Sequence, residues 1–521
     1  MSGYPSQFQE LYVVSDIHMG GDPGFQIFNR GRRLGAFIDH VAGQRPEDDV
    51  ALVLDGDVVD SLAETNMRDY VALDGDTAVR MVERIATDPA FAPTWEALAR
   101  FVKRPRRHLV IVVGNHDIEL ALPVVEDWIR RRLAEDDAGA QSRITFATHG
   151  EGFACRVGAA RVFCTHGNEV DQWNWVDYNL LGQLANAINA GRHADRDQWQ
   201  PNAGTRLVKD VMNVVKHRYP FVDLLKPETA AVAGVLMAID WDTFKKIDVT
   251  AAFPVLRDKV RGGLITRNLL SAETASFAGV TRYDLANEVA VQLLGPSLRQ
   301  AVREARGVGT VLREDDLLEA AGRLVAQGKR ASDLVVVGEM VETLGAWDLV
   351  AGWVGLVDKV EGLRRALTDW LAKDSTYDAT SQADPTYDAV GARAGNGVDV
   401  VITGHTHLAR ALPLGGQRLY YNCGTWIRLL RLTTEALDAR VFESRVWPEL
   451  TQASVAALDS SLIPGPGGTE VPLLYDRTNA THVSDQGTKV VCRLLRVSGG
   501  EDGVPLRLLD EDGTMPKEIR R

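Results

Sequence analysis

Five short clusters of aspartate, asparagine and histidine could together bind metal ions. In chain order they are Asp16-Ile17-His18, Gly56-Asp57-Val58-Val59-Asp60, Gly114-Asn115-His116-Asp117, His166-Gly167 and Gly404-His405-Thr406-His407. Carboxylate oxygen, imidazole nitrogen and amide oxygen suit borderline divalent metals such as Mn, Fe or Zn. One such cluster is common in proteins, whereas five in one chain indicate a metal centre. Two metal ions could hold one hydroxide between them and clamp a phosphate against it.

Each cluster directly follows a short apolar run that is typical of a buried strand. These runs are Leu11–Val14, Ala51–Leu54, Leu109–Val113, Arg161–Cys164 and Val398–Ile402. Stretches with helical spacing separate the first three runs, at Leu34–Val41, Thr77–Ile85 and Pro93–Val102. Alternating strands and helices predict the α/β class. In open α/β sheets ligands bind beyond the carboxyl ends of the strands, so all five clusters are expected at one edge.

The chain between the fourth and fifth clusters departs from this rhythm. Residues 172–395 predict one large helical insertion that could cap the site, and residues 373–396, at its end, have the composition of a flexible loop. The predicted helices are Tyr178–Ile188, Arg206–Val215, Thr229–Ile239, Leu285–Leu294, Ser297–Arg306, Arg313–Gln327 and Leu356–Leu371. Because the insertion starts just after His166, its first residues should stand near the clusters.

These first residues have two readings each. Trp173 and Trp175 either form a stacking surface or apolar wall for a substrate, or they anchor the insertion as core. Asp171 either hydrogen-bonds a ligand histidine or the substrate, or it caps a helix. After the first cluster, Asn29, Arg30, Arg32 and Arg33 either meet a distal phosphate or, in the case of the arginines, lie exposed at a helix entry. For the tryptophans and the arginines the second reading is the commoner one in proteins.

Length and composition indicate an ordinary globular protein of several domains. The chain has 521 residues, 45% hydrophobic and 25% charged, and its net charge of −13 disfavours binding of long nucleic acids. Four scattered cysteines make no disulfide framework, and the polar N-terminus lacks a signal sequence. The longest apolar stretch, Thr229–Ile239, is too short to span a bilayer. We therefore expect a cytoplasmic protein, with peripheral membrane contact and oligomeric state left open.

The cluster order DxH, GDxxD, GNHD, a single His and GHxH resembles that of the calcineurin-like metallophosphoesterases. The resemblance implies a four-layer α/β/β/α sandwich, here with the large helical insertion and a small C-terminal β module. It places the core in residues 8–171 and 396–450 and the insertion in 172–395. A Gly- and Pro-rich linker over 463–469 leads into the β-rich module over 464–521. The opening Asp16 to Gly20 and the segment His166 to Asp171 look most like UDP-2,3-diacylglucosamine diphosphatases.

The resemblance also implies a role for each residue. One metal would be held by Asp16, His18, Asp57 and His407, and Asp57 would bridge to a second metal. The residues Asn115, His166 and His405 would complete that second site, with Mn²⁺ the first choice of cation and Fe or Zn the alternatives. His116 would stay off the metals and stabilise or protonate the leaving oxygen, while Asp117 would orient His116. Asp60 would support its loop or contact a metal-binding side chain rather than bind metal itself.

Three functions are consistent with these residues. The first is hydrolysis of a small or lipid-linked phosphomonoester or diphosphate by a metal-bridging hydroxide that attacks phosphorus in line. The second is a nucleotide phosphodiesterase or nuclease that uses the same chemistry. The third is a binding scaffold without catalysis, which is disfavoured because such scaffolds tend to lose ligands and none is missing here.

Overall fold

The structure is a computed structural model. It describes residues 6–64, 74–171, 174–192, 201–225, 358–372, 378–395, 397–511 and 517–520, and positions 199, 235, 238–240, 300, 374 and 376 between them. The helices predicted at 229–239, 285–294, 297–306 and 313–327 lie wholly or mostly outside the described residues, and so does Trp173.

The larger of two central sheets has eight strands. Four of them run parallel in the order β2 (Glu10–Val14), β3 (Val50–Asp55), β4 (Arg107–Val112) and β5 (Ile144–Ala147). The C-terminal module continues this sheet, because β15 pairs antiparallel with β2. Its strands are β15 (Asn479–Asp485), β16 (Lys489–Ser498), β17 (Arg507–Asp510) and β18 (Lys517–Arg520).

The second sheet has six strands and packs face to face with the first. Its order is β1 (Gln7–Phe8), β6 (Phe153–Val157), β7 (Ala160–Cys164), β8 (Val400–Thr403), β10 (Leu419–Cys423) and β9 (Ala409–Pro413). Side chains alternate across each strand, so Leu11 and Val13 of β2 enter the core between the sheets, with Ile402 opposite. Tyr12 and Val14 enter the core under the helices. Strands buried on both faces read as continuous apolar runs, which explains why the sequence revealed them.

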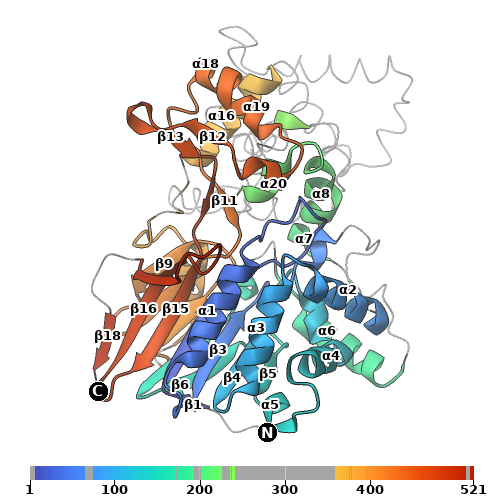
Figure 1. Cartoon of the computed structure of the whole chain (residues 1–521), viewed down its shortest axis with the longest axis vertical. Helices are drawn as coiled ribbons and strands as arrows, with labels where there is room; N and C mark the ends of the chain where they lie inside the picture. Colours follow the sequence, from blue (N-terminus) through green and yellow to red (C-terminus); the bar gives the residue numbers. More distant parts are fainter. Residues whose placement is uncertain are drawn as a thin grey trace, which may run out of the picture.

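Helices cover both outer faces and complete a four-layer α/β/β/α sandwich, which confirms the predicted fold class. Over the larger sheet lie α1 (Gly31–Gly43), α2 (Gly75–Thr87), α3 (Ala92–Lys103) and α4 (Pro123–Ala134), followed by the short α5 (Ala138–Gln141). Figure 1 shows α1 and α3 in front of β3 and β4. Over the smaller sheet lies α17 (Pro385–Arg393), where Val390 packs with Val401 and Tyr420.

Helix α17 corrects the prediction of a flexible loop over 373–396. The Asp384 side chain accepts a hydrogen bond from the Thr386 N–H at 3.0 Å, and Pro385 occupies the first helical turn. Both features favour a helix start. The polar composition of the stretch hid the helix because α17 buries only a narrow apolar face.

The described part of the insertion is helical where the sequence predicts it. It contains α6 (Tyr178–Asn189), then a run formed by α7 (Ala203–Leu207), the π-helical η5 (Val208–Met212) and α8 (Asn213–Val215). The 3₁₀ helix η6 (Pro220–Leu224) and α16 (Lys359–Leu371) follow. Within the described residues we find no helix that is both long and apolar enough to cross a membrane.

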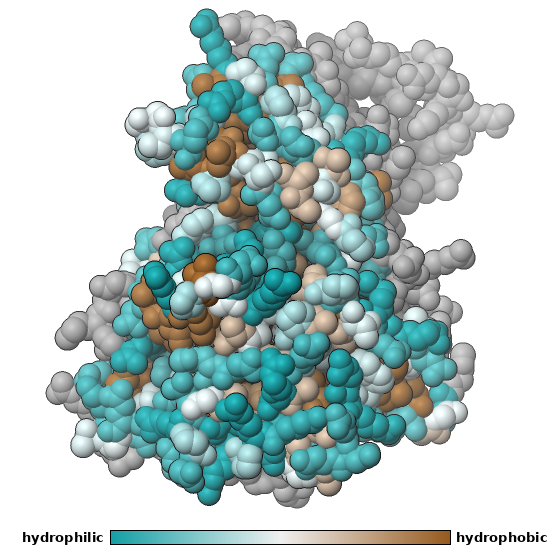
Figure 2. Space-filling view, viewed as in Figure 1, coloured by the Kyte–Doolittle hydropathy of each residue, from teal (hydrophilic) through white to brown (hydrophobic). Residues whose placement is uncertain are grey.

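A second lobe lies above the sheets in Figure 1. It combines α16 with β11 (Arg428–Leu430), α18 (Ala439–Val441), α19 (Trp447–Leu450), α20 (Val455–Leu458), β12 (Leu462–Pro464), β13 (Glu470–Pro472) and β14 (Leu474–Asp476). The stretch 463–469, predicted as a linker, instead forms most of a hairpin, since β12 pairs with β13. On the face shown in Figure 2, hydrophobic residues gather in small areas with hydrophilic residues between them.

The arginines after the first cluster do not lie free for a phosphate. Arg30 pairs with Asp476, and the Arg33 guanidinium lies 2.6 Å from Glu501. Arg32 is exposed, 3.5 Å from Asp502. These ion pairs tie the start of α1 to the C-terminal part of the chain, and of the three arginines only Arg32, with a side chain 73% exposed, fits the exposed reading.

Buried Glu10 at the β2–β15 junction makes stability depend on pH. Its carboxylate accepts hydrogen bonds from Arg45 Nε at 2.9 Å, Ser484 Oγ at 3.2 Å and Tyr12 O–H at 3.1 Å. Burial alone would raise the pKa of Glu10, but His482, Arg45 and Tyr12 outweigh it and lower the pKa to about 2.

We therefore expect Glu10 to contribute stability above pH 4.5 that is lost as the pH falls toward 2, because the unfolded chain takes up the proton first. Glu10→Gln should lower the free energy of unfolding by up to about 3 kcal/mol near neutral pH, and by less as the pH falls below 4.5. Urea denaturation of both proteins between pH 3 and 7 tests this. Parallel stability curves over that range would contradict it.

Candidate metal centre

Side chains from all five clusters meet at the carboxyl ends of the strands. Three groups of side chains each have their ligand atoms within 4.8 Å of one another: Asp16 with His18 and His407, Asp16 with Asp57 and His166, and His18 with Asp60 and His116. Residues separated by almost four hundred positions in the chain thus share one buried space.

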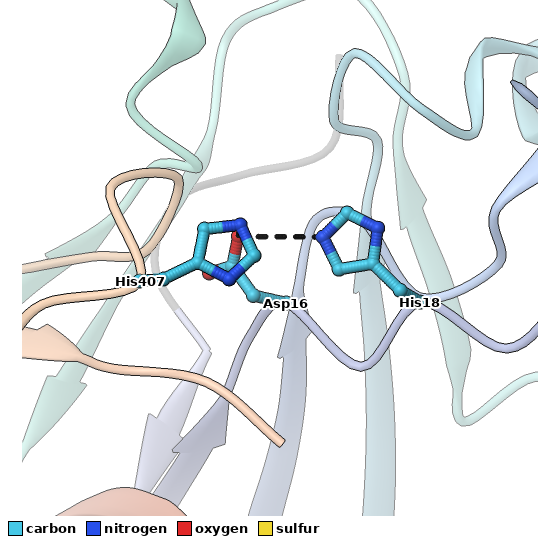
Figure 3. Close-up of side chains that lie close together, drawn as sticks. All are labelled: Asp16, His18 and His407. Carbon is cyan, nitrogen blue, oxygen red and sulfur yellow. Dashed lines mark ion pairs between the residues drawn. The ribbon is translucent and has the colours of Figure 1, made fainter. Parts of the chain in front are cut away.

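The residues assigned to the first metal surround the Asp16 carboxylate. Asp16 Oδ1 lies 3.9 Å from His18 Nε2 and 3.4 Å from His407 Nε2. The rings of His18 and His407 are stacked with centroids 5.1 Å apart. Figure 3 shows the two imidazoles and the Asp16 carboxylate, which overlaps the His407 ring in this view, with a dashed line to His18. This arrangement can present two nitrogens and one oxygen to a single cation.

Asp57 connects this group to the second one. Its Oδ2 lies 3.7 Å from His18 Nε2 and 3.2 Å from His166 Nε2. The ring of His405 lies edge-on to that of His166, with centroids 5.3 Å apart. The loop that carries Asn115 contacts Asp57, because the His116 N–H donates a hydrogen bond to Asp57 Oδ1 at 2.9 Å. One carboxylate oxygen therefore faces histidines of both predicted metal sites.

The loops hold these residues in an uncommon backbone conformation. Positive φ angles occur at Asp16 (53°), His18 (53°), Asp57 (52°), His405 (69°) and His407 (58°). The left-handed region costs an L-residue about 1–2 kcal/mol, and such strain gathers at functional sites.

Two glycines make room for the ligands. A Cβ at Gly56, whose φ is 85°, would lie 2.3 Å from His166 Nδ1. A Cβ at Gly404 would lie 1.8 Å from Ser15 Oγ and 2.5 Å from Asp16 Oδ2. Any side chain at either position would push a predicted ligand out of place, so glycine is required there.

The donor atoms fit divalent cations. Buried Asp16 Oδ1, both ring nitrogens of His18, Asn115 Oδ1 and His166 Nε2 have no hydrogen-bond partner among the described residues. Buried polar atoms without partners are rare and costly in folded proteins. Oxygen and imidazole nitrogen atoms left open in one space are what a metal site offers. Divalent cations would be held by Asp16 Oδ1, Asn115 Oδ1, His166 Nε2 and His18 Nε2, while His18 Nδ1 lies 3.4 Å from Asp60 Oδ2.

Outer contacts fix the orientation of three histidines that are predicted ligands. His166 Nδ1 lies 2.8 Å from the Asp55 carbonyl oxygen, and His407 Nδ1 lies 3.0 Å from Thr425 Oγ1. His405 Nε2 lies 3.0 Å from Asp171 Oδ2, which leaves Nδ1 as the nitrogen that could bind metal. Such contacts set the tautomer and strengthen the ligand.

Of the two readings of Asp171, the structure shows the contact with His405, a predicted ligand. Thr425 was missed in the sequence. The available signal was its position two residues beyond β10. Its hydroxyl also donates a hydrogen bond to the Asp16 carbonyl oxygen at 2.9 Å.

The residue that orients His116 is Asp60, which corrects the role given to Asp117. His116 Nδ1 lies 3.1 Å from Asp60 Oδ1. Both Asp117 oxygens instead accept backbone N–H groups, from Gly114 and Val58, each at 2.7 Å. Asp117 thus shapes the loop, and Asp60, which also caps the 3₁₀ helix η1 (Ser61–Ala63), reaches the imidazole.

The charges of the centre favour ionised carboxylates at two positions. Burial alone would raise the pKa of Asp57, but the facing His166 and His116 imidazoles hold that pKa well below its usual range. Burial would likewise raise the pKa of Asp60, and His116 and His18 lower it well below the usual range. Both carboxylates are therefore ready to bind or orient cationic partners.

The start of the insertion lies over the centre. Val208, Met212, Asn213 and Lys216 line a small pocket together with His18 and His116. Asn213 Nδ2 donates to the Leu62 carbonyl oxygen at 2.8 Å, and its Oδ1 is buried without a partner among the described residues. Lys216 is 3% exposed and lies 3.3 Å from Asp223 Oδ2. No sequence signal pointed to Asn213 or Lys216.

Comparison with known families identifies the first part of the chain. The family model described as calcineurin-like phosphoesterase matches residues 10–231. The fifth cluster lies beyond this match, and the fold carries His405 and His407 to the other four. Comparisons with curated proteins and with solved structures gave no significant match.

Proposed function

Since residues 10–231 belong to the calcineurin-like phosphoesterase family, a family of hydrolases that act on phosphoesters, we propose that this protein hydrolyses a small or lipid-linked phosphomonoester or diphosphate. The observation that carries the proposal is the set of buried, unpartnered ligand atoms around Asp57. When bound, two divalent cations supply a nucleophile at neutral pH and neutralise phosphate charge. Mn²⁺ is the cation we propose first, because the mixed oxygen and nitrogen donors suit it.

The chain's own residues position the substrate and handle the proton. His116 lines the pocket beside His18 and is held by ionised Asp60, so its other nitrogen, Nε2, can donate a proton to the leaving oxygen. The ion pair with Asp60 keeps a proton on Nδ1 and thereby fixes the ring orientation. Asp117 keeps the loop of His116 in place through the Gly114 and Val58 N–H groups.

Lysines of the insertion support a monoester or diphosphate over a diester. Buried Lys216 lines the pocket of His116, and the Nζ of Lys209 lies 3.4 Å from the Glu64 carbonyl oxygen near the same loop. Burial lowers the pKa of Lys209, while the carboxylates of Glu119, Asp60 and Glu64 oppose this shift and keep negative charge around the ammonium group. A dianionic phosphate carries one more negative charge than a diester and gains more from such cations.

A nucleotide phosphodiesterase of the same chemistry is the second candidate. It is favoured by Trp175, which is exposed beside the ligand Asn115. For both candidates we propose a cytoplasmic enzyme, since all four cysteines are free and buried, as expected in a reducing compartment.

Assays of p-nitrophenyl phosphate and bis-p-nitrophenyl phosphate test the proposal. Chelated protein should be inactive, and added Mn²⁺ should restore turnover with the monoester preferred. Lys216→Met should lower kcat/KM for the monoester about 10-fold more than for the diester, because it removes a charged hydrogen-bond donor. Thermal unfolding checks that the variant is folded, since Asp223 loses its partner. Turnover that is unaffected by chelation, or equal losses for both esters, would contradict these roles.

A further inference from the structure

A cavity next to the metal centre has aromatic walls. It has a volume of ≈ 120 Å³ and is lined by Asn115, Leu62 and Ile118 of the core, and by Trp175, Trp199 and Asn202 of the insertion. Asn115 is a predicted metal ligand, so a phosphate at the centre would place its organic group within reach of this cavity. The pocket that contains His116 and Lys216 lies on the other side of η1 and shares none of these lining residues.

The chain holds Trp175 out from the core. Trp175 is 53% exposed, whereas its neighbour Val176 is 3% exposed. The backbone around it is anchored, because Asn168 Nδ2 donates to the Asn174 carbonyl oxygen at 3.2 Å and Asn202 Nδ2 donates to the Trp175 carbonyl oxygen at 3.3 Å. A fixed loop that leaves a large aromatic ring half exposed forgoes the stabilisation of burying it. That loss is offset if a ligand covers the ring.

A second tryptophan of the cavity lining carries a buried hydrogen-bond donor. The indole Nε1 of Trp199 is buried and has no hydrogen-bond partner among the described residues. An unsatisfied buried donor costs about 1–3 kcal/mol, which a ligand acceptor would recover. A surface for stacking together with a spare N–H suits a planar ring with acceptor atoms better than an alkyl chain.

We propose that this cavity binds a planar aromatic ring in the organic group of the substrate, stacked on Trp175 while the phosphate lies at the metal centre. The inference rests on the proposed function and narrows it to phosphoesters of ring-bearing alcohols or nucleosides. A cavity of ≈ 120 Å³ is of the order that accepts a single small ring. The net charge of −13 favours a single nucleotide or aryl phosphate over a polynucleotide.

Matched pairs of ligands test the ring. The first pair is AMP and ribose 5-phosphate, and the second is phenyl phosphate and ethyl phosphate. Trp175→Ala should raise KM for the ring-bearing member of a pair roughly 5- to 150-fold and leave the other member within about twofold. Trp175→Phe should keep most of the affinity because it retains a ring. Leu509→Ala, at an equally exposed site (54%) on β17, is the control.

The outcomes separate the ring from its alternatives. Loss for AMP and phenyl phosphate together supports a site for any aromatic ring, and loss for AMP alone supports a nucleobase site. Equal changes for both members of each pair, or a larger loss for octyl phosphate than for phenyl phosphate, would overturn the proposal.

If the wild-type protein hydrolyses none of these esters, the proposed function fails by itself. The ring site is then decided by equilibrium dialysis of AMP against ribose 5-phosphate on the Mn²⁺-loaded wild type and on Trp175→Ala. Equal retention of the two ligands by the wild type would overturn the inference.

Discussion

Replacing Asp57 with asparagine should strip the protein of both metal ions and reduce turnover by roughly 10³-fold or more. The Asp57 Oδ2 atom lies 3.7 Å from His18 Nε2 and 3.2 Å from His166 Nε2, so it faces ligands of both predicted sites. An amide keeps the size of the side chain and the bond from the His116 N–H. It loses the negative charge that would offset the repulsion between two cations.

Metal content per chain, measured by mass spectrometry after dialysis against Mn²⁺, is the direct readout. Asp369→Asn is the matched control, because Asp369 is also buried but lies on α16, outside the five clusters. The control should retain two ions per chain. If Asp57→Asn also retained two ions and the normal rate, Asp57 would not bridge the sites.

The ligand clusters could be predicted because two physical constraints coincide in the sequence. The strands are buried on both faces and therefore read as apolar runs, as in Val50–Asp55. Their ends then turn polar abruptly, since the loops carry the chemistry. Sequence order alone did not show that His407 lies beside His18. His18 follows β2 of the larger sheet and His407 follows β8 of the smaller one, so the packing of the two sheets brings these strand ends together.

Roles that depend on which oxygen reaches which atom could not be predicted. Asp60 and Asp117 are both acids close to His116, and only the loop backbone decides between them. The Gly114 and Val58 N–H groups converge on Asp117 and occupy both of its oxygens. That choice is set by three-dimensional loop geometry, which residue type and spacing do not encode.

Long-range pairing was hidden for a different reason. The polar residues of α17 and the arginines at the start of α1 are stable in solvent as well as in contact with other residues. The composition of the sequence therefore does not reveal their partners. Trp175 shows the same limit, because an isolated tryptophan is found more often in a core than on a surface, yet here it is 53% exposed. Departures from the usual burial preference are expected at functional or strained sites, so residue type alone could not place Trp175.

His116→Ala should leave both metal ions bound and slow the reaction in proportion to how poorly the leaving group departs. His116 is 6% exposed, lies edge-on to His18 with ring centroids 4.8 Å apart, and offers Nε2 because Nδ1 faces Asp60. General acids contribute about 10²–10⁴-fold. We expect a loss of about 100-fold or more for phenyl phosphate and a much smaller loss for p-nitrophenyl phosphate, whose leaving group needs little protonation.

His108→Ala is the control for removing an imidazole. His108 lies on β4, at the end of the strand away from the metal centre, and pairs with Asp49 at 2.9 Å. It should change neither metal content nor the dependence of rate on the leaving group. Loss of metal in His116→Ala would mean that His116 is a ligand.

A comparison of Asp60→Asn with Asp117→Asn then identifies the positioning residue for His116. Asp60→Asn removes the charge beside His116 Nδ1. It should slow hydrolysis of phenyl phosphate about 10-fold more than that of p-nitrophenyl phosphate, which is a smaller difference than in His116→Ala. Asp117→Asn disturbs the Gly114 and Val58 bonds and should lower thermal stability with a smaller change in that dependence. The reverse pattern, at equal metal content, would return the orienting role to Asp117. If the dependence of rate on the leaving group were the same in both variants as in the wild type, His116 would donate its proton without help from either carboxylate.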